Sequence, residues 1–166
     1  MKNNTINTGL DFNASFYQQL NGFYVPTKGE KSPAPKIIAF NQPLAEELGL
    51  DYKNLSQDDL ANLFSGSIQA QGSEPFAQVY AGHQFAGFSP QLGDGRAIML
   101  GEIIDTKGQR KDIHLKGSGQ TPFSRGGDGK AGIGPVLREY ILGEAMHALN
   151  IPATRALAAT LTGEKV

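Results

Sequence analysis

The sequence contains no cysteine, only three histidines and no long hydrophobic run. Without cysteine, disulfides, thiolate metal sites and thiol catalysis are excluded, and an intracellular setting is allowed. No stretch of about 20 apolar residues, the length that spans a bilayer, is present, and the N-terminus lacks the apolar core of a signal peptide. We therefore expect a cytoplasmic protein with no membrane partner.

Neither sign of charge is in excess. The sequence has 15 Lys and Arg residues and 16 Asp and Glu residues, which gives a net charge of -1. A chain with this balance has no general attraction for nucleic acid, so we expect no nucleic-acid partner and only local binding of anions. With 166 residues, of which 39% are hydrophobic, the chain can bury one ordinary core.

Glycine, in contrast, is abundant. It accounts for 21 of the 166 residues, well above the average share of roughly 7%. Most of it lies between Gly82 and Gly143, where the sequence Gly-Asp-Gly occurs twice. Such an excess is typical of loops that need a positive φ or that bring the backbone close to a ligand.

The stretch from Gly93 to Glu139 combines two glycine turns, a strand lysine and a helix. Alternating residues predict strands at 96–104 and 112–116, joined by a charged turn. Lys116 ends the second strand directly before a Gly-Ser-Gly loop. A strand lysine is usually a solvated edge residue, but the adjoining glycines favour a functional one. This order of elements is how a kinase-like small lobe presents a lysine and a glutamate to a triphosphate.

A helix is predicted from Pro135 to Leu149, with Glu139 in its first turn. The helix dipole alone would favour an acidic residue there. Glu139 has a second interpretation, because a lysine that holds phosphate oxygens needs a carboxylate to fix its flexible stem. We therefore expect Lys116 and Glu139 to lie within reach of each other, with the helix packed beside the two strands.

The remaining predicted elements are short. The first 36 residues predict a loosely packed arm whose aromatic side chains dock on a surface, which could belong to a part of the protein outside this sequence. Two short helices are predicted to begin at the N-caps Asn41 and Ser56, the latter in a capping box with Asp59, and to end at Gly49 and Gly66. Short strands are predicted at 36–40 and 76–80.

Three other candidate sites are set aside. The Walker phosphate-binding motif fails because Ala131 stands where Ser or Thr is required. Gly127, Gly129 and Gly132 fit the dinucleotide pattern, but no strand precedes them and no acidic residue about 20 positions on could hold a ribose. His83 has no acidic or second histidine partner at ligand spacing, which favours a structural role.

Four segments carry a specific resemblance to a known family. They read Glu-Pro-Phe-Ala-Gln-Val-Tyr-Ala-Gly-His-Gln-Phe (74–85), Gln-Leu-Gly-Asp-Gly-Arg-Ala (91–97), His-Leu-Lys-Gly-Ser-Gly-Gln-Thr-Pro-Phe-Ser-Arg (114–125) and Glu-Ala-Met-His-Ala-Leu-Asn-Ile-Pro-Ala-Thr-Arg-Ala-Leu (144–157). These segments resemble the selenoprotein O family of kinase-like protein adenylyltransferases, in its bacterial form. The resemblance runs from about Asn41 to the C-terminus.

The resemblance implies an α+β fold. It predicts a kinase-like N-lobe at 41–166, with an antiparallel sheet, a glycine-rich loop and a C-type helix, preceded by a short helical arm at 1–40. It also implies that ATP, with Mg²⁺ or Mn²⁺, donates AMP to Ser, Thr or Tyr hydroxyls of protein substrates. Carried over residue by residue, the family's nucleotide contacts fall on Gly93, Gly95, Arg96, Lys116, Asp128 and Gly129, with Glu139 as the helix partner of Lys116.

Two kinds of departure from the family stand out. Ala86, Gly126 and Lys130 replace the usual Gly, Met and Arg. The family's catalytic aspartate, its metal ligands and two further phosphate-binding arginines belong to a C-terminal lobe that this sequence lacks. We therefore expect no catalytic residue and no metal ligand within the chain, which resembles the nucleotide-binding portion of a transferase and is expected to be inactive as this fragment.

Two other interpretations stay open. The chain could be a non-catalytic pseudokinase remnant that binds a nucleotide or a protein partner. It could also be a glycine-rich α+β domain in which Lys116 and Glu139 are structural.

Overall fold

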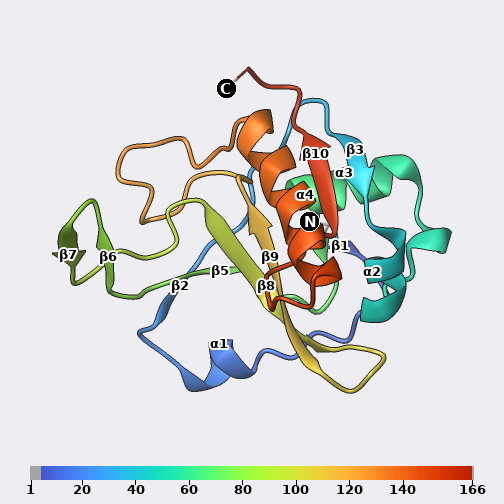
Figure 1. Cartoon of the computed structure of the whole chain (residues 1–166), viewed down its shortest axis with the longest axis horizontal. Coiled ribbons are helices and arrows are strands. Elements are labelled where there is room, and N and C mark those ends of the chain that lie inside the picture. Colours follow the sequence, from blue (N-terminus) through green and yellow to red (C-terminus); the bar gives the residue numbers. More distant parts are fainter. Residues whose placement is uncertain (1–4, 166) are drawn as a thin grey trace.

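The computed structural model describes residues 5–165 (Figure 1). It is a mixed α+β fold with antiparallel sheets, as the sequence predicts. Its elements in chain order are β1 (Thr5–Ile6), α1 (Ser15–Gln19), β2 (Tyr24–Pro26), β3 (Lys36–Phe40), α2 (Gln42–Leu48), the 3-10 helix η1 (Tyr52–Asn54), α3 (Gln57–Ser65), β4 (Gln69–Ala70), β5 (Phe76–Gln78), β6 (Gly82–Gln84), β7 (Gly87–Ser89), β8 (Ala97–Ile104), β9 (Arg110–Lys116), α4 (Ile133–Ala148) and β10 (Ala158–Leu161).

The central sheet has four antiparallel strands in the order β2-β5-β8-β9. Strands β8 and β9 form the predicted hairpin, in which Ala97 lies opposite Lys116 and Ile104 opposite Arg110. The register shifts between Met99 and Gly101, which makes a bulge in β8. The hairpin places Lys116 at the end of β9, beside the start of β8.

Three two-stranded ladders complete the fold: β3 with β10 and β6 with β7 are antiparallel, whereas the two-residue ladder of β1 with β4 is parallel. Buried side chains of α2 pack against Ile103 of β8, and a second cluster is formed by Ile98, Leu100 and Leu115 of the hairpin. In Figure 1 the β6–β7 hairpin and the loop at 117–132 lie on one side of the molecule, and α2 and α3 lie on the other.

The caps of α2 and α3 confirm the predicted ends of these helices. The Asn41 side chain accepts a hydrogen bond from the backbone N–H of Leu44 at 3.1 Å. Ser56 and Asp59 form a reciprocal capping box, with the Asp59 N–H donating to Ser56 Oγ at 3.0 Å. Both helices end at a glycine in the left-handed region, Gly49 with φ 80° and Gly66 with φ 85°. These ends form as predicted because each involves residues only a few positions apart.

Helix α4 begins at Ile133, two residues earlier than predicted, with Gly132 as its N-cap, and ends at Ala148. Pro135 is the third helical residue, where its missing N–H costs nothing because the first four N–H groups of a helix have no partner within the helix. Glu139 is consequently the seventh helical residue, and the prediction that it lies in the first turn is wrong. The helix packs against β10 and meets the hairpin at Lys116.

The N-terminal arm contains the predicted short helix, α1, but it is not loosely packed. Its residues Phe16, Tyr17 and Tyr24 surround Phe76 of β5, with ring centroids 5.2, 6.0 and 5.0 Å from the Phe76 ring. Strand β2 joins the central sheet, and Glu102 of β8 accepts the backbone N–H of Phe16 at 3.0 Å. Three aromatic side chains of the arm therefore dock on the chain's own sheet and help to bury Phe76, whereas Phe23 is 58% exposed.

Candidate functional site

Lys116 and Glu139 are in direct contact, as the sequence predicts. The Lys116 ammonium lies 2.9 Å from each of the two carboxylate oxygens of Glu139, so the contact joins the end of β9 to the second turn of α4. The two side chains are 51% and 49% exposed. Because the influence of the helix dipole falls off within the first turn, the dipole is a weaker explanation for Glu139 than the sequence indicated.

An ion pair this exposed contributes only about 0–1 kcal/mol to stability, because water screens it and two long side chains must be ordered. The fold therefore gains little from this contact. The pair does hold the Lys116 ammonium in a defined place while leaving about half of the side chain open to solvent.

The first glycine turn, which carries Gly93, Gly95 and Arg96, is held against the loop at 121–124. Gly93 has φ 67°, and a Cβ added to it would overlap the ring of Phe123. A Cβ on Gly95 would lie 3.0 Å from the carbonyl oxygen of Phe123. The Ser124 hydroxyl donates to the carbonyl of Gly95 at 2.6 Å. Close packing thus requires glycine at Gly93 and leaves little room for a side chain at Gly95, independently of any ligand.

Asp94, between these two glycines, is buried and was given no role by the sequence. Its carboxylate accepts the backbone N–H of Gln78 at 3.0 Å, and its carbonyl accepts the Thr121 hydroxyl. Burial first, and then the neighbouring Asp94 carboxylate, raise the pKa of Tyr80. Asp94 therefore fastens the first glycine turn to the end of β5.

The first glycine turn also meets the strand that carries Lys116. The backbone N–H of Gly117 donates to the carbonyl of Arg96 at 2.8 Å, next to the Ala97–Lys116 pair of the hairpin. The side chains of Arg96 and Lys116 are both exposed. Two cationic side chains are thus presented at one end of the hairpin.

The second glycine loop, which carries Asp128 and Gly129, lies beside the segment that follows Lys116. Gly129 has φ 68° and packs on the backbone of Gly119, where a Cβ would overlap the Gly119 carbonyl. The Asp128 carboxylate accepts the backbone N–H of Lys130 at 2.9 Å, and its side chain is otherwise exposed. Ser118 and Lys130 form an isolated antiparallel bridge.

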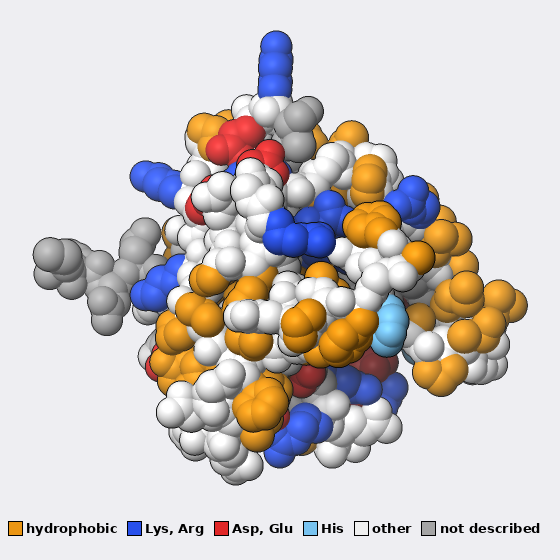
Figure 2. Space-filling model, turned by 90° about the vertical axis from the view of Figure 1, so that its left-hand side faces the viewer, with side chains coloured by type: hydrophobic (Ala, Val, Ile, Leu, Met, Phe, Trp, Pro, Cys, Tyr) orange, Lys and Arg blue, Asp and Glu red, His pale blue; other side chains and the backbone are white. Residues whose placement is uncertain are grey.

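The structure therefore joins two of the predicted site residues by a side-chain contact and brings the others near through the backbone. Among residues 5–165, no hydrogen bond or ion pair links the side chain of Arg96 or Asp128 to Lys116. Figure 2 shows the face of the molecule that includes the β6–β7 hairpin, with Lys and Arg side chains near its middle among hydrophobic ones.

Sequence reasoning missed three residues that hold the second loop: Lys130, Glu30 and Glu164. The Lys130 ammonium lies 3.0 Å from a Glu30 carboxylate oxygen and 3.2 Å from a Glu164 oxygen. Its side chain is only 8% exposed. Glu30 is 100 positions from Lys130 in the sequence, and no local pattern connects the two.

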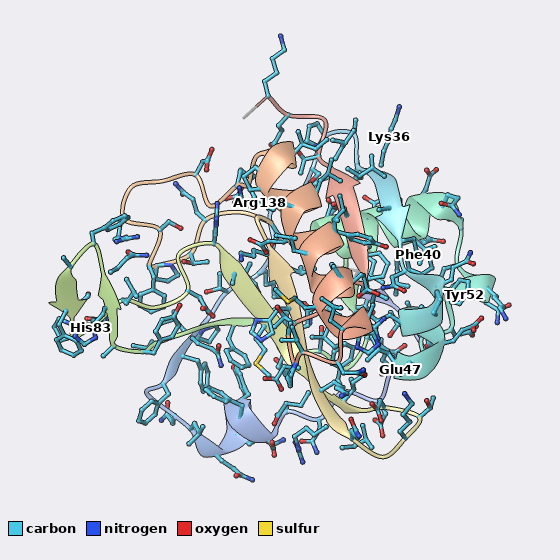
Figure 3. All side chains as sticks on the ribbon, viewed as in Figure 1. Lys36, Phe40, Glu47, Tyr52, His83 and Arg138 are labelled. Carbon is cyan, nitrogen blue, oxygen red and sulfur yellow. The ribbon has the colours of Figure 1, made fainter. Side chains whose placement is uncertain are left out.

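His83 lies on the β6–β7 hairpin, at the edge of the molecule and away from helix α4, which carries Arg138 (Figure 3). Its ring centroid is 5.1 Å from that of Phe88 on the neighbouring strand. The Arg125 guanidinium donates to the Gln84 side chain at 2.9 Å, which links this hairpin to the loop at 121–127.

In the part of the chain that the structure describes, no group of three or more acidic or histidine side chains is placed to hold a metal ion. None of the helices between residues 5 and 165 is long and apolar enough to cross a bilayer.

Taken together, the fold and the contact define a mixed α+β protein in which a helix glutamate fixes a strand lysine beside two glycine loops. The chain belongs to the family described as protein adenylyltransferase SelO, which matches residues 7–166.

Curated relatives agree with this assignment. A protein nucleotidyltransferase YdiU of Cereibacter sphaeroides (strain ATCC 17029) is 60% identical over 153 residues, 92% of this chain and 32% of the relative. Proteins with the same description from Agrobacterium fabrum and Chromobacterium violaceum are 68% and 61% identical over 80% and 86% of this chain, covering 27% and 30% of their own lengths. The chain thus spans about a third of the length of the relatives it matches.

Proposed function

We propose that this chain is the nucleotide-holding portion of a cytoplasmic protein adenylyltransferase, with ATP and the Ser, Thr or Tyr hydroxyls of proteins as substrates. Residues 41–166 form a kinase-like small lobe in this proposal, with the segment around Gly93 and Gly95 as its glycine-rich loop, and residues 1–40 are its arm. Helix α4 is the C-type helix.

The observation that carries the proposal is the contact of Lys116 with both oxygens of Glu139, each at 2.9 Å. The stability of the fold does not explain this contact, because so exposed an ion pair contributes only about 0–1 kcal/mol. Phosphate binding gives a better reason, because a carboxylate that fixes the long lysine stem lowers the entropy lost when the ammonium binds phosphate oxygens.

The other proposed contacts surround this pair. Arg96, exposed near Lys116, would add a second cation for the phosphates. Gly93, Gly95 and Gly129 would bring backbone close to the nucleotide, and Asp128 would contact it from the second loop. The positive charge of Lys116 and Arg96 fits a triphosphate, and these residues bind and orient it without moving a proton.

In AMP transfer, the acceptor hydroxyl oxygen forms a bond to the α-phosphorus, the bond to the bridging oxygen breaks, and pyrophosphate leaves. That reaction needs a base for the hydroxyl proton, and Mg²⁺ or Mn²⁺ would neutralise charge on the phosphates. The donor set among residues 5–165 does not fit a metal ion, since no group of three acidic or histidine side chains is gathered there. We therefore place the metal ligands outside these residues and derive no step through the metal; the base is placed outside them as well, because the family resemblance assigns the catalytic aspartate to the C-terminal lobe.

A second candidate function is non-catalytic binding of a nucleotide or protein, as in a pseudokinase. It concerns these 166 residues taken on their own, which span 26–32% of the length of the curated relatives compared with them. Transfer of labelled AMP by a chain of the relatives' length separates the two candidates, because only the first candidate predicts it.

The test is incubation with labelled ATP, Mg²⁺ or Mn²⁺ and a protein acceptor, together with an ATP titration. We expect the 166-residue chain to bind ATP weakly, to lose that binding in Lys116→Ala and to transfer no label, whereas a chain of the relatives' length transfers AMP. Equal ATP binding by the wild type and Lys116→Ala would overturn the proposed site. Label transfer by the short chain that disappears in Lys116→Ala would show that the catalytic groups lie within it.

A further inference from the structure

Glu30, on the segment between β2 and β3, touches both loops that border the proposed nucleotide site. Its carboxylate accepts the backbone N–H of Gln120 at 3.0 Å and lies 3.0 Å from the Lys130 ammonium. Its own backbone N–H donates to the carbonyl of Ser118 at 2.8 Å. One residue of the arm therefore contacts the segment after Lys116 and the segment after Gly129.

Among the residues that the structure describes, the two loops are also joined directly, by the isolated bridge of Ser118 with Lys130 and by two hydrogen bonds. The Gly119 N–H reaches the Gly129 carbonyl at 3.4 Å, a long hydrogen bond, and the Gln120 side chain donates to the Gly127 carbonyl at 2.8 Å. Glu30 lies outside both loops and adds a further link between them. Its aliphatic stem packs on Gly119, because a Cβ added to Gly119 would lie 2.5 Å from Glu30 Cγ.

Electrostatics strengthens this connection. The Lys130 side chain is 8% exposed and has carboxylates of Glu30 and Glu164 at 3.0 and 3.2 Å. Burial by itself would lower the pKa of Lys130, but the two carboxylates outweigh it, so the pKa lies above its ordinary value. The Gln120 N–H, and then Lys130, lower the pKa of Glu30. Both groups are therefore charged at neutral pH, and they form an ion pair in which the distance is short but the geometry is not that of a hydrogen bond.

We propose that Glu30 is a positioning residue for the nucleotide site, which fixes the loop of Asp128 and Gly129 relative to Lys116. This inference rests on the proposed function. Glu30 itself needs no contact with the nucleotide, because it acts through Gln120 and Lys130. Glu164 neutralises Lys130 as well, but it has no hydrogen bond to the segment that follows Lys116.

Two alanine variants of the full 166-residue chain separate these roles. Glu30→Ala removes the side-chain contacts of Glu30 with Gln120 and Lys130, whereas Glu164→Ala, the matched control, removes a carboxylate from the same lysine and leaves the contacts of Glu30 in place. We expect Glu30→Ala to weaken ATP binding on the order of tenfold, as loss of a group that orients a binding site typically does. Glu164→Ala should stay within about twofold, since Glu30 still pairs with Lys130.

Amide NMR spectra supply a readout that a general loss of stability would not produce. In Glu30→Ala the amide signals of Gln120 and of residues 127–130 should shift, while those of the β8–β9 hairpin and α4 stay in place. Spectra of Glu30→Ala that show no change in residues 127–130 would overturn the inference.

The binding data give three further outcomes. Unchanged ATP affinity in Glu30→Ala, with affinity lost in Lys116→Ala, overturns the role of Glu30 and leaves the proposed function standing. An equal loss in Glu164→Ala shows that the charge around Lys130, and not the tie through Glu30, controls affinity, and overturns the inference as well. A wild-type chain that binds no ATP overturns both the inference and the proposed function.

Discussion

The Lys116 ammonium lies 2.9 Å from both carboxylate oxygens of Glu139, across the space between a strand end and a helix. The two residues are 23 positions apart in the sequence. Because each side chain is about half exposed, the pair holds a cation in place at the surface and adds little to the stability of the fold.

Lys116→Met should therefore separate stability from binding. We expect the free energy of unfolding to change by no more than about 1 kcal/mol, and ATP affinity to fall by about tenfold or more, because hydrogen bonds to charged groups are worth about 1.5–3 kcal/mol. Urea unfolding and ATP titration measure the two quantities. Lys53→Met is the matched control, since Lys53 forms an exposed pair with Glu46 at 3.6 Å on another part of the surface. A large loss of stability in Lys116→Met alone would mean that the pair is structural.

Gly93→Ala should destabilise the protein more than Gly108→Ala. Both glycines have a positive φ, 67° and 78°, so both substitutions carry the same backbone penalty. Only at Gly93 does the added Cβ meet a neighbour, the Phe123 ring, whereas nothing lies within 4 Å at Gly108. We expect an additional cost of about 1–3 kcal/mol at Gly93, as for other overpacked sites. Equal unfolding free energies of the two variants in urea would contradict the close packing of the first glycine turn.

Ser56→Ala should cost about 1 kcal/mol, the usual loss when an N-cap side chain is removed. The Ser56 hydroxyl accepts the N–H of Asp59 at 3.0 Å, and the Asp59 carboxylate accepts the N–H of Ser56 at 3.2 Å. Ser56→Thr keeps the hydroxyl and should stay close to the wild type. Thermal unfolding followed by circular dichroism distinguishes the variants, and equal melting temperatures for Ala and Thr at this position would show that the cap contributes nothing.

Stability should fall as the pH drops below the ordinary pKa of Glu102. Burial would raise the pKa of this carboxyl, but the Phe16 N–H, the Ser15 hydroxyl and the Arg110 guanidinium outweigh burial and hold it below the unfolded value of 4.5. A lowered pKa in the folded state means that the stabilisation is complete above pH 4.5 and is lost as the pH falls through the folded pKa.

Glu102→Gln removes this titration. Its unfolding free energy, measured by urea across the acid range, should depend less steeply on pH than that of the wild type below pH 4.5. The same pH dependence in both proteins would show that Glu102 does not anchor the start of α1 in solution.

The sequence by itself determined the elements whose signals are local. The capping box at Ser56 and the glycine that ends α2 follow from residues within a few positions of one another, and the β8–β9 hairpin joins two strands that are consecutive in the chain, so these elements have local signals. The Lys116–Glu139 contact was also predicted from the sequence, because a lysine that holds phosphate oxygens needs a carboxylate to fix its stem and a kinase-like small lobe supplies that carboxylate from a helix.

The start of α4 was predicted less well. Pro135 is favoured in the first turn of a helix, so the sequence predicts a start there, two residues after the observed start at Ile133. Gly132 takes the N-cap position without a side-chain hydrogen bond, and no pattern marks it. The earlier start makes Glu139 the seventh helical residue instead of the fifth, well beyond the first turn.

Only the tertiary structure decided which distant residues meet. Phe76 packs against aromatic side chains of the arm, and β10 pairs with β3. Glu30 forms an ion pair with Lys130, which is 100 positions away in the sequence. Ring packing and ion pairs of this kind carry no sequence period, because their partners are brought together by the sheet and not by spacing along the chain. The arm therefore could be recognised as aromatic from its sequence, but its place on the central sheet, and the tie it makes to the loop of Asp128 and Gly129, depend on the folded chain.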